Sequence, residues 1–213
     1  MPELELEPES HRYTLDGVTI PGCTQVLAAM GCTPGFNWLT LDQLEFYRSR
    51  GHAIHKAVEL AVKGTLDKRT ISAEINPYLV GWDRFCEEHK VEVMEVDGEP
   101  FVERQLYHPA FRYGVTPDVV AWVGGRETMV EIKATSAHAP ATGLQLAAQL
   151  LATRYEILSL PKVVARAGLR LLPEEPYYDL KYYNERSDES VWLSLLNSFN
   201  WLSQHKLLRE NHR

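Results

Sequence analysis

The chain has 213 residues, of which 45% are hydrophobic and 24% charged, a composition typical of one globular domain with a sizeable core. Its net charge of -7 excludes nucleic-acid binding through bulk positive charge alone, so such a contact would need a local basic surface. The sequence lacks the roughly 18 consecutive apolar residues of a membrane helix, and its acidic start, MPELELEPES, differs from a signal peptide. Its three cysteines lack CxxC spacing. We therefore expect reduced thiols in a cytosolic protein without membrane association.

Residues 1–90 are predicted to be mainly helical, because apolar residues recur there at helical spacing after a short alternating segment. Glycine and proline set the expected boundaries. In chain order we expect a hairpin turning at Asp16-Gly17, a helix from Thr24, a helix over 41–63 broken at Gly51 and ended by Gly64, and a helix over 72–90 kinked or restarted at Pro77.

Residues 91–213 are predicted to form a sheet-centred core. The segment 91–135 is rich in Val, Tyr, Phe and Thr, and its turn signals predict an antiparallel meander of about four strands. The remaining expected elements are a helix over 142–158, strands over 162–172 and 177–183, and a closing helix over 188–208. This order predicts an α/β fold in a single domain over 1–213, with a central mixed β-sheet flanked by helices.

Three of the charged residues in one hairpin of this core are predicted to lie together. If Gly124-Gly125 is a two-residue turn, the register of the flanking strands continues until Asp118 lies opposite Glu131. Opposed residues point to the same face, with Cβ atoms about 4.5 to 5.5 Å apart. Lys133 shares that face because side chains alternate along a strand. The spacing therefore predicts two neighbouring carboxylates with a lysine beside them.

These strands are apolar on both faces, so the two carboxylates are expected at the edge of a buried region. Buried carboxylates repel each other and lose solvation, and a divalent cation resolves that conflict. Oxygen ligands suit Mg²⁺ or Mn²⁺, and Lys133 would stand close to a water that such an ion activates. The alternative from spacing alone is a surface hairpin in which Glu131 and Lys133 form a minor salt bridge.

Pro117-Asp118 followed by Glu131-Ile132-Lys133 resembles the PD-(D/E)xK signature of restriction-endonuclease-like nucleases. Its flanks resemble the RecB-type branch, which includes phage exonucleases and the mitochondrial genome-maintenance exonuclease. Residues 50–59 are similar to an early helix motif of that branch, and residues 145–149 to a late helix. The segment 21–27 resembles the start of the phage enzymes. The likeness covers residues from about 11 to 150 and implies a restriction-endonuclease-like core.

The resemblance implies a role for each matching residue. Lys133 would assist the nucleophilic water, and Gln145 would position substrate or Lys133. Gln149 stands where the family often has tyrosine. Mg²⁺ or Mn²⁺, as one or two ions, would be held by Asp118, Glu131, the Ile132 carbonyl and His55. Iron-sulfur members of the branch use four cysteines, so this chain, with three, should be a member without a cluster.

Three further residues are expected near these ligands. His52 and Glu59 share a helix face with His55, a pattern that by itself also resembles a zinc site or an ordinary packed surface. Glu103 alternates onto the same strand face as Phe101, and it is either near the site or a surface carboxylate.

Candidate DNA contacts lie on the same motifs and on one later strand. In a strand, Lys162, Arg166 and Arg170 share a face, which predicts either a ridge that follows phosphates or an ordinary solvated face. Arg50 and Gln149 are the other two candidates.

The expected function is a metal-dependent deoxyribonuclease that hydrolyses phosphodiester bonds. The resemblance implies exonuclease action on DNA ends in phage-type recombination or repair, with DNA as partner and with a single-strand annealing or single-strand-binding protein beside it. The protein would act in the cytoplasm, which is the host's if a phage encodes it. The alternatives are a structure-specific or flap endonuclease and a catalytically silent nucleic-acid-binding module of the same fold.

Overall fold

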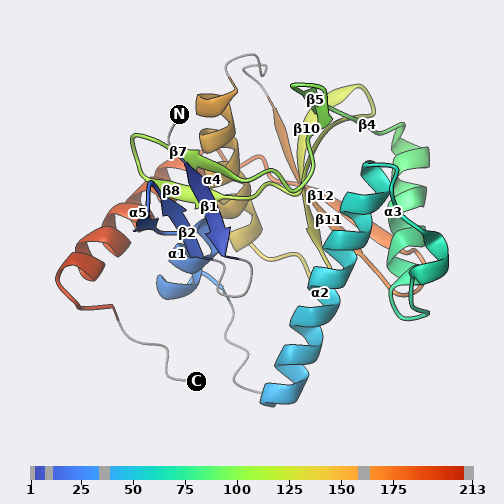
Figure 1. The fold of residues 1–213 in the computed structure, drawn as a ribbon, viewed down its shortest axis with the longest axis horizontal. Coiled ribbons are helices and arrows are strands. Elements are labelled where there is room, and N and C mark those ends of the chain that lie inside the picture. The colour runs from blue at the N-terminus through green and yellow to red at the C-terminus, as the bar shows by residue number, and fades with distance from the viewer. Residues whose placement is uncertain (1–2, 8–11, 34–38, 158–163, 209–213) are drawn as a thin grey trace.

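The computed structural model describes residues 3–7, 12–33, 39–157 and 164–208. A five-stranded sheet at its centre has the order β12-β11-β10-β9-β4, and helices cover both of its faces (Figure 1). Strands β10 and β11 run parallel, and the other neighbouring pairs are antiparallel. The sheet is therefore mixed, as predicted. Its strands are β4 (Glu92–Val93), β9 (Val119–Val123), β10 (Arg126–Lys133), β11 (Ala165–Leu171) and β12 (Tyr178–Tyr182).

Helices α2 and α3 lie on one face of the sheet, and α1, α4 and α5 lie on the other (Figure 1). Alternation along the strands supplies an apolar surface to each side: Ile132 belongs to the cluster with α2 and α3, whereas Met129 belongs to the cluster with α4 and α5. The helices are α1 (Cys23–Ala29), α2 (Leu41–Val62), α3 (Asn76–His89), α4 (Ala141–Glu156) and α5 (Asp188–Gln204), with a 3-10 turn over Lys68–Thr70.

The predicted meander over 91–135 is wrong in its connectivity. Only β4, β9 and β10 of this segment join the central sheet, and the other short strands form two separate pairs. These are β5 (Glu95–Val96) with β6 (Glu99–Pro100), and β7 (Leu106–His108) with β8 (Tyr113–Val115). The strands on either side of each predicted turn do pair with each other, but the resulting hairpins belong to separate sheets.

At the N-terminus, the predicted hairpin is confirmed, because β2 (Arg12–Leu15) pairs with β3 (Val18–Ile20) around the Asp16-Gly17 turn. Strand β1 (Leu4–Glu7) pairs with β2 on its other side. Together the three strands form a small sheet that the sequence pattern did not predict in full.

Two helix boundaries differ from expectation. Helix α2 continues through Gly51, so the predicted break there is wrong, although Gly64 follows its end with a φ of 67°. Helix α3 begins at Asn76 with Pro77 in its first turn, where the missing N–H costs no hydrogen bond.

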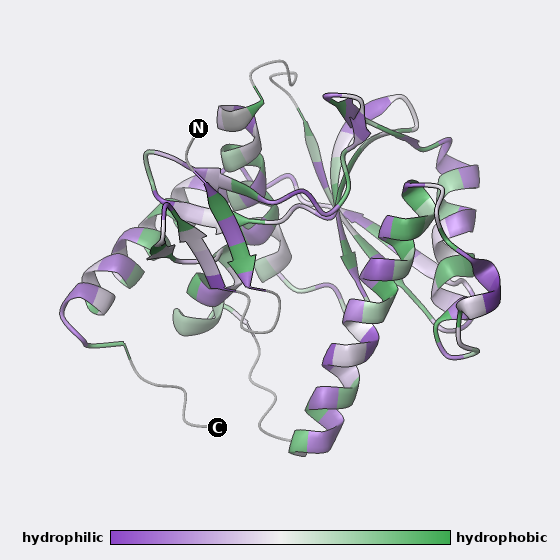
Figure 2. Ribbon diagram, viewed as in Figure 1, coloured by the Kyte–Doolittle hydropathy of each residue, from purple (hydrophilic) through white to green (hydrophobic). Residues whose placement is uncertain are grey.

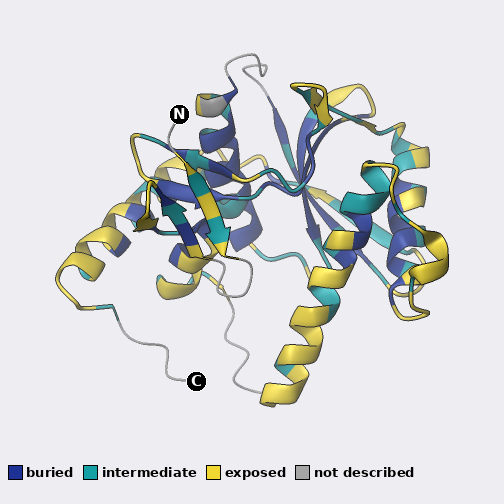
Figure 3. Cartoon of the chain, viewed as in Figure 1, coloured by how far each residue is buried: buried dark blue, intermediate teal, exposed yellow. Residues whose placement is uncertain are grey.

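Green segments in Figure 2 coincide with dark blue segments in Figure 3 on the central strands and on the inward sides of the helices, as burial of apolar surface requires. In the described residues, no helix is both long and apolar enough to cross a membrane.

Candidate metal and catalytic site

The β9–β10 hairpin positions the first carboxylate. The predicted register is confirmed from the turn inward, with Val123 opposite Arg126 and Val119 opposite Val130. The pairing ends one step before Asp118 and Glu131. At that point Oδ2 of Asp118 accepts a hydrogen bond of 2.6 Å from the backbone N–H of Ile132. The carboxylate is buried, and its position is fixed against the backbone of β10.

Three potential metal donors meet beside this carboxylate. Nδ1 of His55, from α2, lies 2.9 Å from Oε1 of Glu103 and 3.5 Å from Oδ1 of Asp118. One ligand atom from each of the three residues lies within 4.8 Å of the other two. Helix α2, the segment before β7 and the residue just before β9 thus contribute one donor each.

Glu103 reaches this position through an irregular backbone. The strand alternation expected over 101–105 is wrong: Val102 forms an isolated bridge with Val119, and Glu103 has a φ of 48°. Its N–H donates to the carbonyl oxygen of Asp118 over 2.9 Å. This bond holds the two residues side by side, so Glu103 is a member of the donor group itself.

Glu131 and Lys133 lie on the face of β10 that α4 covers. Nζ of Lys133 donates to Oε1 of Glu131 over 2.7 Å and to Oε1 of Gln145 over 3.1 Å. Nε2 of Gln145 donates to the same Glu131 oxygen over 2.7 Å. The expected closeness of Lys133, Glu131 and Gln145 is therefore present. The Glu131 side chain is 3% exposed and that of Lys133 28% exposed, which excludes the alternative of a surface salt bridge.

Gln149, one turn further along α4, completes the surroundings of Glu131. Its Nε2 donates to Oε2 of Glu131 over 2.8 Å and to the Thr116 carbonyl over 3.3 Å. The residue is 2% exposed. It therefore supports the carboxylate from within the core, and its predicted role as a DNA contact finds no support in this position.

The charges of the site shift one another's titration. Burial acts to lower the pKa of His55, but Asp118 and Glu103 outweigh it and hold that pKa well above its ordinary value. Burial, together with repulsion from Asp118, raises the pKa of Glu131 against the opposing effect of Lys133. Burial acts to lower the pKa of Lys133, yet Glu131 and Asp118 raise it, so the ammonium form is favoured.

The geometry of the donor group fits a divalent cation. Neighbouring ligands around an ion with bonds of about 2.1 Å are about 3 Å apart in octahedral geometry. The two separations from the imidazole nitrogen of His55 are close to that value. Because the N–H and C=O of a strand residue point to the same side, the Ile132 carbonyl faces the same edge as its N–H, which binds Asp118. Glu131 is the expected ligand that the structure groups elsewhere, with Lys133 and the two glutamines.

Two residues expected beside the ligands lie outside the donor group. Glu59 accepts hydrogen bonds of 2.7 Å from both Lys56 and Lys63, which ties it to the surface of α2. His52 is exposed on the same helix. The helix-face pattern correctly grouped His52, His55 and Glu59, but only His55 reaches the donor group.

The predicted phosphate ridge on β11 finds no support. Arg166 pairs with Asp188 over 2.8 Å, and Arg170 pairs with Asp179 over 2.9 Å. Both guanidinium groups also donate to backbone carbonyls. These cations hold α5 and β12 in place, and Lys162 lies outside the described residues.

Arg50, the remaining predicted DNA contact, is packed among aromatic rings. Its guanidinium carbon lies 5.0 Å from the ring centre of Tyr47, 5.6 Å from that of Phe46 and 5.7 Å from that of Tyr78. This packing joins α2 to α3 and occupies the planar faces of the guanidinium.

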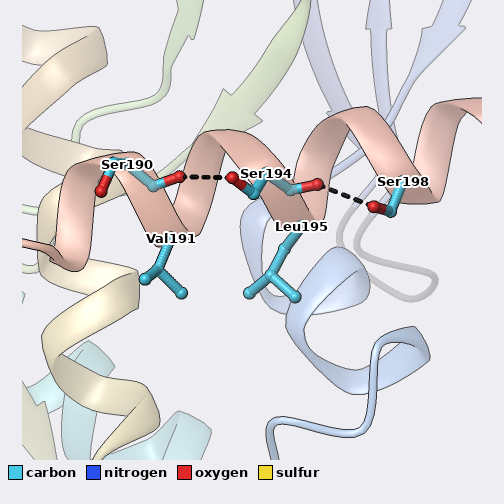
Figure 4. A pocket seen from close by; sticks show the side chains of 5 residues that line it. All are labelled: Ser190, Val191, Ser194, Leu195 and Ser198. Carbon is cyan, nitrogen blue, oxygen red and sulfur yellow. Dashed lines mark hydrogen bonds between the residues drawn. The ribbon is translucent and has the colours of Figure 1, made fainter.

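A separate depression lies on the surface of α5 (Figure 4). Its lining residues are Ser190, Val191, Ser194, Leu195 and Ser198. The hydroxyls of Ser194 and Ser198 each donate to the carbonyl one turn earlier. None of these side chains is charged, and none belongs to the donor group.

No protein-family model and no curated protein matches the sequence. Among solved structures, the chain is similar to the crystal structure of SSO0001, at 15% sequence identity and a TM-score of 0.36. That similarity covers 73% of this chain and 71% of the other. At this level it carries no argument about function.

Proposed function

We propose that the chain is a metal-dependent deoxyribonuclease with a restriction-endonuclease-like core of the RecB-type branch. The observation that carries this proposal is the meeting of His55, Glu103 and Asp118. Glu131 and Lys133 bind each other close enough to Asp118 for its charge to raise both of their pKa values. The PD-(D/E)xK resemblance supplies the reaction class, and the geometry supports it because four distant segments supply complementary groups to one place.

The donor set suits Mg²⁺ or Mn²⁺, with the imidazole of His55 favouring Mn²⁺. Asp118, Glu103, His55 and the Ile132 carbonyl would hold the ion, with Glu131 on the adjoining side. When bound, the ion supplies a positive charge that stabilises a phosphate in the transition state and lowers the pKa of water.

Lys133 provides the fixed cation of this site. Its ammonium group is held by Glu131 and Gln145, so it is oriented before substrate arrives. A positioned ammonium stabilises negative charge that develops on phosphoryl oxygens. Glu131 keeps Lys133 protonated, and Gln145 fixes both side chains from α4.

The proposed reaction is hydrolysis at DNA ends, as an exonuclease. The test is metal-supplemented digestion of end-labelled linear DNA beside a covalently closed circle. We expect Mg²⁺ or Mn²⁺ to support loss of the linear DNA while the circle survives. Rapid cutting of the circle would show that the protein is an endonuclease. Cutting of a flapped duplex at its junction would identify the flap-cutting alternative.

A catalytically silent DNA-binding module is distinguished by Lys133→Ala. We expect this variant to lose hydrolysis while it still binds the metal, because Lys133 is not among the donors. Lys68→Ala is the matched control, since Lys68 forms an exposed pair with Asp83 on another surface. Equal digestion by Lys133→Ala and the wild type would refute the mechanism. Action in recombination or repair, beside a single-strand annealing or binding protein, rests on the resemblance.

A further inference from the structure

Helix α2 extends beyond the body of the protein. Its C-terminal half packs against the core through Ile54, Ala57 and Val58, which are buried. Its N-terminal half projects away from the sheet and is mostly yellow in Figure 3, and residues 45–49 are all exposed (Figures 1 and 3). His55 lies where the projecting half meets the buried half. The projecting half therefore leads directly to the donor group.

Gly51 stands inside this helix without a structural need for glycine. The helix is continuous through it, and its backbone has an ordinary helical φ. A Cβ placed there would meet no heavy atom within 4 Å. A helix with glycine at an interior position is less stable than one with alanine, because glycine loses more backbone entropy on folding and buries no side-chain surface. The packing of the described residues does not offset this loss of helix stability. Close approach of a ligand to the helix backbone would explain the glycine.

Gly51 and Arg48 share the helix face of His55. They precede His55 by four and seven residues, which are the spacings of neighbours along one side of an α-helix. At 1.5 Å per residue, the Arg48 backbone lies about 10 Å from that of His55 along the axis. We call Arg48, Gly51 and His52 the approach face of α2.

One cation of this region is open to a polyanion. Lys56 pairs with Glu59 and Arg50 packs among aromatic rings, which leaves Arg48 on the projecting half. Arg48 is exposed and forms no ion pair with any residue that the structure describes. Unlike Arg166 and Arg170, it is therefore available to a phosphate.

We propose that the sugar-phosphate backbone of a DNA strand runs along the approach face, close against Gly51, with Arg48 on a phosphate, and so reaches the donor group. This proposal rests on the proposed function and specifies how its substrate enters. The 10 Å between Arg48 and His55 correspond to about three nucleotides at about 3.4 Å per nucleotide. Since the contact is made to backbone phosphates, it is independent of base sequence.

Gly51→Ala tests the proposal, because stability and binding should change in opposite directions. Alanine favours the helix, so Tm should rise by about 2–4 °C. The added methyl group should weaken binding of a fluorescently labelled single-stranded DNA oligonucleotide by about threefold, and Gly51→Leu should weaken it by at least tenfold. Binding is measured by anisotropy with Ca²⁺ as the metal, and a gel verifies that the probe is intact. Ser49→Ala, on an exposed position of the same half-helix, is the control and should not change binding.

Arg48→Ala provides a second, independent measurement. It should reduce the slope of log affinity against log salt by about one, as loss of one phosphate contact predicts. Oligonucleotides shorter than about three nucleotides should be insensitive to it.

Unchanged DNA affinity in Gly51→Leu, in a wild type that hydrolyses DNA, would overturn the approach face and leave the proposed function standing. A change in oligomeric state without a change in affinity would also overturn it, by making this face an interface between copies. A wild type that neither binds nor hydrolyses DNA with any divalent cation would instead refute the proposed function itself.

Discussion

Oδ2 of Asp118 accepts the backbone N–H of Ile132, while Oδ1 of the same carboxylate faces Nδ1 of His55. One oxygen is thus used to anchor the side chain to β10, and the other is directed at the donor group. An aspartate in this position cannot rotate away without leaving a buried N–H unpaired.

Asp118→Asn should strongly weaken metal binding. Loss of a directly ligating oxygen is expected to weaken affinity more than about 100-fold, since even outer partners of metal ligands are worth about 10–100-fold. In the wild type, metal at 100 times its Kd adds about 2.7 kcal/mol of stability, or a Tm increase of roughly 5–10 °C. Thermal melts with and without Mn²⁺ check this. An equal Tm increase in the variant would show that Asp118 is not a ligand.

Metal affinity should rise with pH because of His55. In the metal-free protein the pKa of His55 is raised, so the protonated form is favoured, whereas a metal binds the neutral imidazole. Binding must therefore release a proton below that pKa. Affinity should increase up to tenfold per pH unit and become constant above the raised pKa. Calorimetry in two buffers of different ionisation enthalpy measures the number of protons released on metal binding. Metal binding by the wild type without proton release would contradict the prediction.

The same titration affects stability without metal. The pKa of His55 is higher in the folded protein than its value of about 6.5 in the unfolded chain. The resulting stabilisation is complete at pH values below about 6.5 and is lost as the pH rises through the folded-state pKa. The metal-free protein should therefore lose stability on the alkaline side of neutrality, as followed by urea denaturation at a series of pH values. His55→Gln should remove that part of the pH dependence. An unchanged pH dependence in the variant would assign it to other groups.

Gln149→Ala should weaken both the fold and the reaction. The substitution removes the hydrogen bond to Oε2 of Glu131 inside the core, at a cost of about 1–3 kcal/mol measured by denaturation. That hydrogen bond lowers the pKa of Glu131. Its loss should therefore raise that pKa and move the acidic limb of the pH-rate profile to higher pH. Gln204→Ala, at the exposed end of α5, is the control. If the acidic limb did not move, Gln149 would have no influence on the reaction through the pKa of Glu131.

Gly125→Val should destabilise the hairpin that carries the site. Gly125 has a φ of 76°, a conformation that a β-branched residue adopts only with strain. We expect a loss of about 1–3 kcal/mol, with weaker metal binding because Asp118 and Ile132 lie on opposite strands of this hairpin. Denaturation and metal titration measure the two effects, and full stability of the variant would contradict the prediction.

The hairpin could be predicted because its information is local. Two glycines define the turn, the period of two sets the faces, and Asp118, Glu131 and Lys133 follow from a register that the structure confirms up to Val119. The layers of the fold were likewise readable, since apolar residues on both faces of β9 and β10 require helices on both sides.

The position of Glu103 could not be read from the sequence. It depends on a positive φ and on a bond to the Asp118 carbonyl, neither of which leaves a periodic signal. The arginines of β11 show the same limit: their spacing fits a phosphate ridge, but Asp188 and Asp179, which pair with them, belong to separate elements. A pattern within one strand cannot show which charges another element brings to it.

The donor group also joins parts of the chain that are far apart in sequence. Residues 55, 103 and 118 belong to a helix, an irregular segment and a strand end, and an ion bound to all three would act as a cross-link among them. The occupied site would then fix the inner end of α2 to the edge of the sheet, and with it the direction in which the outer half projects. The same ion that serves the chemistry would thereby also set the orientation of the arm over which a strand would enter.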